Sequence, residues 1–336
     1  MSWTLGPFAR EDAHNPVLEP GERAFACPMR GAEVGWASAH VFNPAAVVHE
    51  GRVWMLVRAE DGSGGGIGEH TSRLGLAESD DGLAFCLRDE PVLYPMDDAQ
   101  KSNEWPGGCE DPRLVEMPDG SYLLTYTQWD RKTARLAVAT SPDLLNWTKR
   151  GPAFSGAYAD LWSKSGAIVT KVVGDRLVAA RIGGRYWMYW GEGRVYAATS
   201  ADGLAWEPVL DEQSEILTLL APRPGRFDSL LAEPGPPAVR TADGIVLLYN
   251  GRNDPANGDP TLTGETYSAG QALFDAEDPL KLMDRTDTYF LTPERPYERT
   301  GQFTDGTVFI QGLVRFRDRW MLYYGTADSA VAVASA

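Results

Sequence analysis

One sequence phrase recurs five times along the 336-residue chain and limits the folds that it can adopt. Each copy has a polar or charged residue at the head of a short apolar strand, then a Gly/Asp turn, then an aromatic-rich run that ends in another polar residue. The heads are Asn43, Asp111, Lys164, Glu233 and Asp305. The runs cover residues 53–57, 122–126, 186–190, 245–249 and 320–324. This spacing, roughly 60–75 residues per copy, suits a four-stranded sheet.

The first three copies are also alike beyond the aromatic-rich run. In each of them a second alternating strand leads into near-identical turns, at residues 79–85, 141–147 and 200–206. Asp and Gly in these turns supply an Asx-type hydrogen bond and a position with positive φ. The fourth copy is looser, and the fifth reaches residue 336 without its outer strands, so we expect N-terminal residues to complete it.

The length of the third copy predicts one addition, an extra hairpin over residues 172–184, because its head lies farther from its run than the others do. No window shows sustained apolar periodicity of 3.6 residues, which predicts little helix. We therefore predict an all-β fold, a five-bladed β-propeller that forms a single domain over residues 1–336.

The amino-acid composition excludes some classes of binding partner. The net charge of −16 and a pI near 4.7 argue against nucleic acid or an anionic membrane surface. No basic and apolar leader opens the sequence, and no stretch approaches the ~18 apolar residues of a spanning helix, so we expect a cytoplasmic protein. Three cysteines without CxxC spacing and four scattered histidines predict neither a disulfide framework nor a metal site, and we expect no cofactor.

A closed ring of five copies would aim the five heads at one central point. The ends of the aromatic-rich strands would add Arg58, Gln128, Glu192, Asn250 and Asp328 to the same mouth. Like charges at short range raise one another's pKa, so a cluster of this kind is typical of a functional site. The alternative for each single residue is a turn former, since Asp and Asn before Pro or Gly are common in loops.

Paired carboxyls on opposite sides of a pocket are what cleavage of a glycoside requires. A protonated carboxyl donates to the leaving oxygen, and an ionised one activates the incoming nucleophile. Aromatic side chains beside the heads could form platforms for sugar rings, or could pack the sheets. They are Trp105, Trp129, Trp162, Tyr189 and Trp190.

Several ordered motifs resemble glycoside hydrolase family 130 over nearly the whole chain. They are Glu-Asp-Pro-Arg at 110–113, Phe-Asn-Pro-Ala-Ala at 42–46, Arg-Ala-Glu-Asp at 58–61 and the stretch from Tyr-Ser-Ala-Gly at 267–270 to Tyr-Tyr-Gly-Thr-Ala-Asp at 323–328. The resemblance implies a five-bladed propeller that acts on β-mannosides with inversion. It implies that Asp111 is the general acid, acting through a hydroxyl of the bound mannose. It also implies that Asn43, Arg58 and Asp305 bind that mannose.

The family resemblance leaves two reactions open, hydrolysis and phosphorolysis. Phosphorylases need a cationic cluster for phosphate, and such enzymes typically have Tyr-His-Gly where this chain has Tyr249, Asn250 and Gly251. Where such enzymes have a small residue before a Gly-x-Pro-Pro segment, this chain has Glu233 at the head of Glu-Pro-Gly-Pro-Pro, and Glu192 lies on the neighbouring unit. A carboxylate would repel phosphate but could act as a base toward water. Arg150, Arg181 and Arg223 could still make an anion site.

Glu192 and Glu233 match the hydrolase branch of the family, whose members resemble β-1,2-mannosidases. The resemblance therefore implies an inverting, exo-acting β-mannosidase that hydrolyses β-1,2-linked manno-oligosaccharides. Asp111 is the predicted acid, and Glu192, Glu233 or both are the predicted base. The predicted sugar-binding residues are Asn43, Arg58, Lys164, Asp305, Tyr249 and Asn250. The alternatives are a β-mannoside phosphorylase that releases mannose 1-phosphate and a non-catalytic sugar-binding propeller. The sequence leaves the oligomeric state open.

Overall fold

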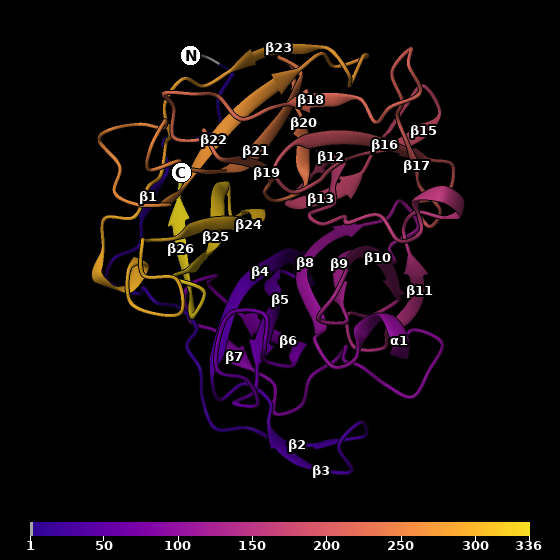
Figure 1. The fold of residues 1–336 in the computed structure, drawn as a ribbon, viewed down its shortest axis with the longest axis vertical. Helices are drawn as coiled ribbons and strands as arrows, with labels where there is room; N and C mark the ends of the chain where they lie inside the picture. Colours follow the sequence, from indigo (N-terminus) through magenta and orange to yellow (C-terminus); the bar gives the residue numbers. More distant parts are fainter. Residues whose placement is uncertain (1–2) are drawn as a thin grey trace.

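The computed structural model describes residues 3–336, and this part of the chain is built almost entirely of β-strands (Figure 1). The one α-helix, α1 (Lys101–Glu104), and two short 3-10 helices, η1 (Gly156–Tyr158) and η2 (Pro296–Glu298), lie in connections. The predictions of an all-β fold and of little helix are confirmed. None of these helices is long and apolar enough to cross a membrane.

Antiparallel pairing divides most strands of residues 3–336 into five successive groups, and parallel pairings join the first four groups to one another. Group 1 comprises β4 (His40–His49), β5 (Arg52–Glu60), β6 (Ser72–Ser79) and β7 (Cys86–Leu87). Group 2 comprises β8 (Gly108–Glu116), β9 (Tyr122–Trp129), β10 (Ala134–Ser141) and β11 (Thr148–Pro152). Group 3 comprises β12 (Ala167–Val173), β13 (Arg176–Ala179), β14 (Arg181–Ile182), β15 (Arg185–Trp190), β16 (Val195–Ser200), β17 (Glu207–Pro208) and β18 (Thr218–Leu220).

The last two groups and one separate hairpin complete the strands. Group 4 comprises β19 (Leu231–Pro234), β20 (Ala238–Arg240), β21 (Ile245–Arg252), β22 (Tyr267–Phe274) and β23 (Leu282–Arg285). Group 5 comprises β24 (Val308–Phe316), β25 (Arg319–Thr326), β26 (Ala330–Ser335) and β1 (Ala9–Arg10). The pairing of β1 with β26 confirms that N-terminal residues complete the last unit. A hairpin of β2 (Ala24–Cys27) and β3 (Ala32–Gly35) lies beyond group 1.

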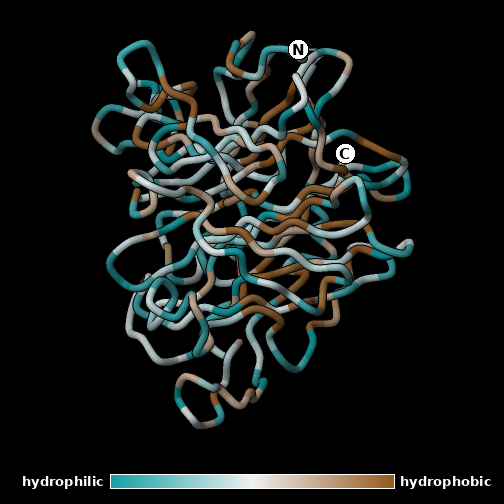
Figure 2. Tube along the Cα trace, turned by 90° about the vertical axis from the view of Figure 1, so that its right-hand side faces the viewer, coloured by the Kyte–Doolittle hydropathy of each residue, from teal (hydrophilic) through white to brown (hydrophobic). Residues whose placement is uncertain are grey.

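The groups surround a common centre, which their first strands face (Figure 1). Each of five buried apolar clusters lies between two neighbouring groups, and one of them joins group 5 back to group 1. In that cluster Val53 and Met55 of β5 pack with Tyr323 of β25 and Val333 of β26. Hydrophobic residues accordingly run through the inner strands, and hydrophilic ones gather on the outer loops (Figure 2). Apolar burial between the groups is thus the main force that holds them around the centre.

A β-bulge near the start of the first strand aims the head residues off the sheet. Asn43 and Asp111 are each the fourth residue of their strand, lie at a break in register and have φ near +48°. Gln311 holds the same place in β24, where the register breaks between Ile310 and Gly312. The fifth head is therefore Gln311. The prediction of Asp305 as this head is wrong, because Asp305 precedes the first strand of the unit.

The predicted extra hairpin of the third unit is confirmed. The chain passes from β12 to β13 through a turn at Gly174, whose φ is +62°. Strand β12 then runs parallel to β20, and β13 pairs with β8 and contacts β4 and β24. The hairpin therefore ties the inner strands of all the other groups to group 3.

Candidate active site

The largest concentration of buried charge lies around a cavity of about 290 Å³ beside the bulges of β4 and β8. Carboxylates outnumber cations in its wall. The carboxylates are Glu60, Asp111, Glu192, Glu233 and Asp328. The cations are Arg58, Lys164 and Arg252. Aromatic rings of Phe42, Tyr267, Phe303 and Phe309 complete much of the apolar wall.

Arg58, at the end of β5, organises one side of the cavity. Its guanidinium donates to Asp111 Oδ1 at 3.1 Å, to Glu60 Oε1 at 2.6 Å and to Glu110 Oε1 at 3.0 Å. It lies over the ring of Phe42, with 4.7 Å between the guanidinium carbon and the ring centroid. All these groups are buried, so each contact is a charge-assisted hydrogen bond in a poorly screened environment.

Asn43 and Asp111 meet because they occupy equivalent bulges on neighbouring groups. Asn43 Nδ2 donates to Asp111 Oδ1 at 2.8 Å, while Asn43 Oδ1 is buried and has no hydrogen-bond partner among the described residues. An unpaired buried acceptor is costly, and the hydroxyl of a bound sugar would satisfy it.

Lys164 bridges the two sides of the cavity. Its Nζ lies 3.5 Å from Asp111 Oδ2 and 3.7 Å from Glu192 Oε1. These two carboxylate oxygens are therefore no farther apart than the sum of the two distances. That limit is compatible with the separation of roughly 6.5–9.5 Å that leaves room for water between the carboxyls of an inverting glycosidase.

Glu233 and Glu192 stand near the ammonium of Lys164. Ser165, whose φ is +60°, donates its hydroxyl to Glu233 Oε1. Behind Glu233, the buried guanidinium of Arg113 donates to the carbonyls of Pro234 and Gly235, which fixes the strand that carries it. Glu192 lies closer to solvent, and its Oε2 accepts the indole N–H of Trp162 at 2.6 Å.

The buried carboxyls divide into two kinds by charge state. Burial opposes ionisation of Asp111, but Arg58 and Lys164 outweigh it and hold its pKa well below the ordinary value. Burial raises the pKa of Glu110 to about 7 and that of Glu233 to about 7, and the pKa of Asp328 to about 6. The free cavity thus combines an ionised Asp111 with Glu110 and Glu233, which are partly protonated near neutral pH.

The structure brings six of the nine predicted site residues to the cavity and places three elsewhere. Asp305 is exposed and accepts the backbone N–H of Glu265. Tyr249 points its hydroxyl at Asp228, away from the cavity, because β21 alternates its faces. Asn250 is buried, and its amide pairs with both the N–H and the carbonyl of Ile310 at 2.8 and 3.1 Å. None of these three residues lines the cavity.

The position of Asn250 leads to a stability prediction. Replacing Asn250 with alanine should lower the free energy of unfolding by about 2–4 kcal/mol, because two buried polar groups of Ile310 lose their partner. Denaturant unfolding would measure this loss, and KM for manno-oligosaccharide should change little. A large rise in KM with unchanged stability would instead place Asn250 in contact with the sugar.

Other wall residues were missed by the sequence reasoning. Glu60, Arg252 and Gln302 carry no repeated motif, and the aromatic wall comes from Phe and Tyr rather than from the expected tryptophans. Trp190 and Tyr189 are buried in the packing between sheets. Trp162 is half-exposed and reaches the site through Glu192. The Glu60 position could have been found in the Arg-Ala-Glu-Asp motif, since residues two apart on a strand share a face.

The cations of the cavity are all engaged. Arg58 binds three carboxylates, Lys164 lies between two, and Arg252 pairs with Glu265. The three unplaced arginines lie elsewhere. Arg150 bonds Thr140, Arg181 bonds backbone carbonyls and Arg223 pairs with Asp228. Within residues 3–336, the cavity wall therefore offers no uncommitted cationic cluster for a phosphate dianion.

Comparison with known proteins identifies the family. The sequence model of a family described as "beta-1,4-mannooligosaccharide phosphorylase" matches residues 10–336. The chain belongs to glycoside hydrolase family 130. A 1,2-beta-oligomannan phosphorylase of Thermoanaerobacter sp. (strain X514), similar to this family 130 chain, is 30% identical over 310 residues, which are 91% of this chain and 93% of the relative.

Solved structures similar to this family 130 protein include a glycosyl hydrolase from Bacteroides ovatus. It is 50% identical, has a TM-score of 0.98, and the match covers 100% of this chain and 94% of that one. Another has the same identity and TM-score, with 100% and 95% covered. It is described by the words "The GH130 family of mannoside phosphorylases contains glycoside hydrolases that target beta-1,2 mannosidic linkages in Candida mannan". The descriptions of these relatives thus include a mannoside phosphorylase and glycoside hydrolases that target β-1,2 mannosidic linkages.

Proposed function

We propose that this family 130 protein is an inverting, exo-acting β-mannosidase that hydrolyses β-1,2-linked manno-oligosaccharides. The observation that carries the proposal is the charge of the cavity, where every cation is already paired and where Glu192 and the partly protonated Glu233 place two carboxyl groups beside Lys164. A phosphate dianion would meet these carboxylates, whereas a water molecule would find a base. The small cavity, near the lower end of the usual range of ~300–1,000 Å³, supports attack on a chain end.

The proposed scaffold is a five-bladed β-propeller in which groups 1–5 are the blades of a single cytoplasmic domain. The apolar clusters between all neighbouring groups support this arrangement. It gives each catalytic carboxyl a separate rigid support, because Asp111 stands on group 2, Glu192 on group 3 and Glu233 on group 4. Fixed supports on opposite walls hold acid and base apart for inversion.

The proposed reaction begins with a proton that the free cavity holds on Glu110 rather than on Asp111. Glu110 and Asp111 both bind the guanidinium of Arg58, which holds the two carboxyls near each other but cannot itself give up a proton. A hydroxyl of the bound sugar or a water molecule between them carries the proton from Glu110 to Asp111. Asp111 passes this proton through a mannose hydroxyl to the leaving oxygen. Glu233, aided by Glu192, takes a proton from water as the water oxygen bonds to the anomeric carbon and the glycosidic bond breaks.

Phosphorolysis is the second candidate, and the names of the curated relatives favour it. If hydrolysis is the reaction, purified protein should release free mannose from β-1,2-mannobiose at the same rate with and without added phosphate. Chromatography with mannose and mannose 1-phosphate standards would measure both products. Turnover that depends on phosphate and yields mannose 1-phosphate would establish a phosphorylase instead.

A further inference from the structure

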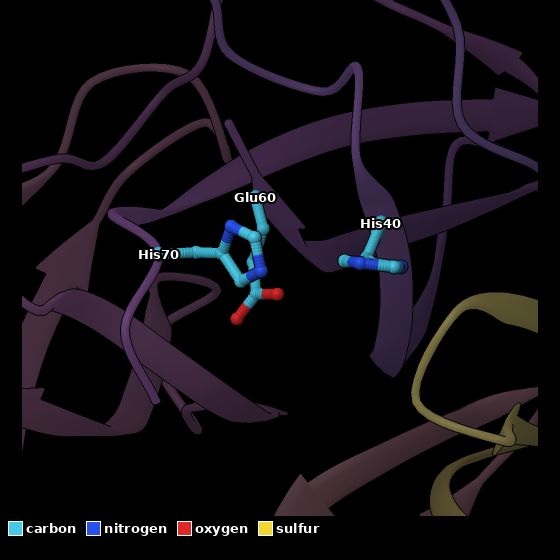
Figure 3. Close-up of side chains that lie close together, drawn as sticks. All are labelled: His40, Glu60 and His70. Atoms are coloured by element: carbon cyan, nitrogen blue, oxygen red, sulfur yellow. The ribbon is translucent and has the colours of Figure 1, made fainter. Parts of the chain in front are cut away.

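Two histidines that sequence spacing did not connect lie together with Glu60 beside the cavity. His40 begins β4, Glu60 ends β5, and His70 is the next-to-last residue of the loop between β5 and β6. One possible ligand atom of each lies within 4.8 Å of the others. In Figure 3 the ring of His70 lies against the Glu60 carboxylate, and His40 faces both. The fold thus gathers three groups of the kind that bind transition metals.

The hydrogen bonds of the two rings determine which nitrogens are free. His70 Nδ1 lies 2.8 Å from the carbonyl oxygen of Asp61, which only accepts, so Nδ1 carries the proton. His40 Nδ1 lies 3.1 Å from Ser329 Oγ, and that hydroxyl donates to the carbonyl of Ala327, so His40 Nδ1 is again the donor. In both rings the lone pair therefore lies on Nε2, the arrangement in which a metal-binding histidine is oriented by its other nitrogen.

The carboxylate side of the cluster also has acceptors to spare. Glu60 Oε1 takes the hydrogen bond of Arg58, and Oε2 takes that of Gln302 Nε2 at 3.0 Å, which leaves Oε2 a second lone pair. Gln302 Nε2 also donates to the carbonyl of Asp328, so the amide cannot be flipped. Its Oε1 is buried and has no hydrogen-bond partner among the described residues. Gln302 lines a cavity of about 280 Å³ together with His40 and His70.

The charges around the cluster favour a cation. Glu60, Glu110 and Asp111 all share the single guanidinium of Arg58. Asp328 lies half-buried in the wall of the candidate active site. Added positive charge would relieve this excess, as bound cations do in acidic sites.

We propose that His40, Glu60 and His70 bind a divalent transition-metal cation of the zinc type. Two imidazole nitrogens and one carboxylate oxygen suit zinc, whose bonds to them are about 2.0–2.2 Å long. Side-chain rotation that moves each group inward by less than about 1 Å would close the site. Gln302 Oε1 or water takes the fourth position.

The cation would fasten the loop over residues 61–71 to the first two strands of group 1. Ile67 of this loop is exposed and lines the candidate active site, so the loop forms part of its rim. His70 is the loop's ligand, and His40 and Glu60 are its anchors on β4 and β5. The proposed role is therefore structural, and no step of the reaction passes through the metal.

Zinc binding to the unaltered protein provides the direct test. Protein stripped with a chelator and titrated with Zn²⁺ alone should bind one ion per chain, and His40→Ala and His70→Ala should each weaken binding at least tenfold. His14→Ala is the matched control, since His14 is exposed and lies outside the cluster, and it should bind as the unaltered chain does. Hydrogen exchange should slow at residues 62–69 when Zn²⁺ is added.

Two results would overturn the site. One is that the unaltered protein binds no zinc, and the other is that His40→Ala and His70→Ala bind zinc as tightly as the unaltered protein does. Circular dichroism would check that the variants fold. If they do not fold, a crystal of the unaltered protein soaked in Zn²⁺ decides the matter. An anomalous peak between His40 and His70 supports the site. A crystal in which zinc is fully bound at other positions but gives no peak between these two rings refutes it. These tests do not depend on the proposed hydrolysis.

Discussion

Replacing Asp111 with asparagine is expected to lower kcat for β-1,2-mannobiose by about 10²–10⁴-fold, the usual contribution of a general acid. The side chain keeps its size and can still accept from Asn43 and Arg58, so the cavity should keep its shape. The amide of asparagine cannot carry the proton that the carboxyl of Asp111 passes on, so the leaving oxygen is no longer protonated. Steady-state kinetics would measure kcat, and calorimetry would measure sugar binding, which should change much less.

The matched control for Asp111 is Asp119→Asn, an exposed aspartate in the turn that follows β8. Its activity should equal that of the unaltered protein. Turnover that survives in Asp111→Asn would remove Asp111 from the role of acid. An unaltered protein that binds the sugar but never turns it over would instead support a non-catalytic sugar-binding protein.

The strand content and the sheet groups could be predicted because they follow from local pattern. Short stretches of the sequence show the alternation of apolar residues, the Asx turns and the missing outer strand of the last unit. The turns at Asp81, Asp143 and Asp202 form as expected, with the carboxylate accepting backbone N–H groups two and three residues on. The same holds for the extra hairpin after β12.

The site could be predicted only in those units where the head of the sequence repeat coincides with the bulge of the first strand. Asn43 and Asp111 share a bulge, and the sequence repeat places them correctly. In the fifth unit an Asp-Gly pair precedes the strand and resembles a head, whereas Gln311 occupies the bulge. The bulge depends on pairing with β25, so a local pattern does not reveal it.

The second limit on prediction is that the sequence does not show which face of the sheet a strand residue occupies or which distant residue it contacts. Asn250 follows Tyr249 on β21, and each could point to the cavity or to a neighbouring sheet. The contacts with Ile310 and Asp228 decide this, and both partners lie far along the chain or in a separate loop. The His40 and His70 cluster is hidden for the same reason, because only the pairing of β4, β5 and β6 brings the two rings together.

Replacing Glu233 with glutamine is the second large effect, an expected loss of about 10²–10⁴-fold in kcat if Glu233 is the base. A base must be ionised, and burial raises the pKa of Glu233 to about 7. In the unaltered protein kcat/KM should therefore fall below about pH 7, as Glu233 gains a proton, and fall again above about pH 7, as Glu110 loses the proton that it supplies. The exposed Glu215→Gln is the control and should leave both rate and profile unchanged.

Ser165 allows the same assignment to be tested without removing the carboxylate. Its hydroxyl donates to Glu233 and lowers the pKa of that carboxyl by stabilising the ionised form. Ser165→Gly removes the donor, and glycine accepts the φ of +60° at this position. The pKa of Glu233 should rise, so the acidic limb of the kcat/KM profile should move to higher pH. The exposed Ser155→Gly should leave it in place. If the limb does not move while Glu192→Gln abolishes turnover, Glu192 is the base, because only the titration of Glu233 is tied to the Ser165 hydroxyl.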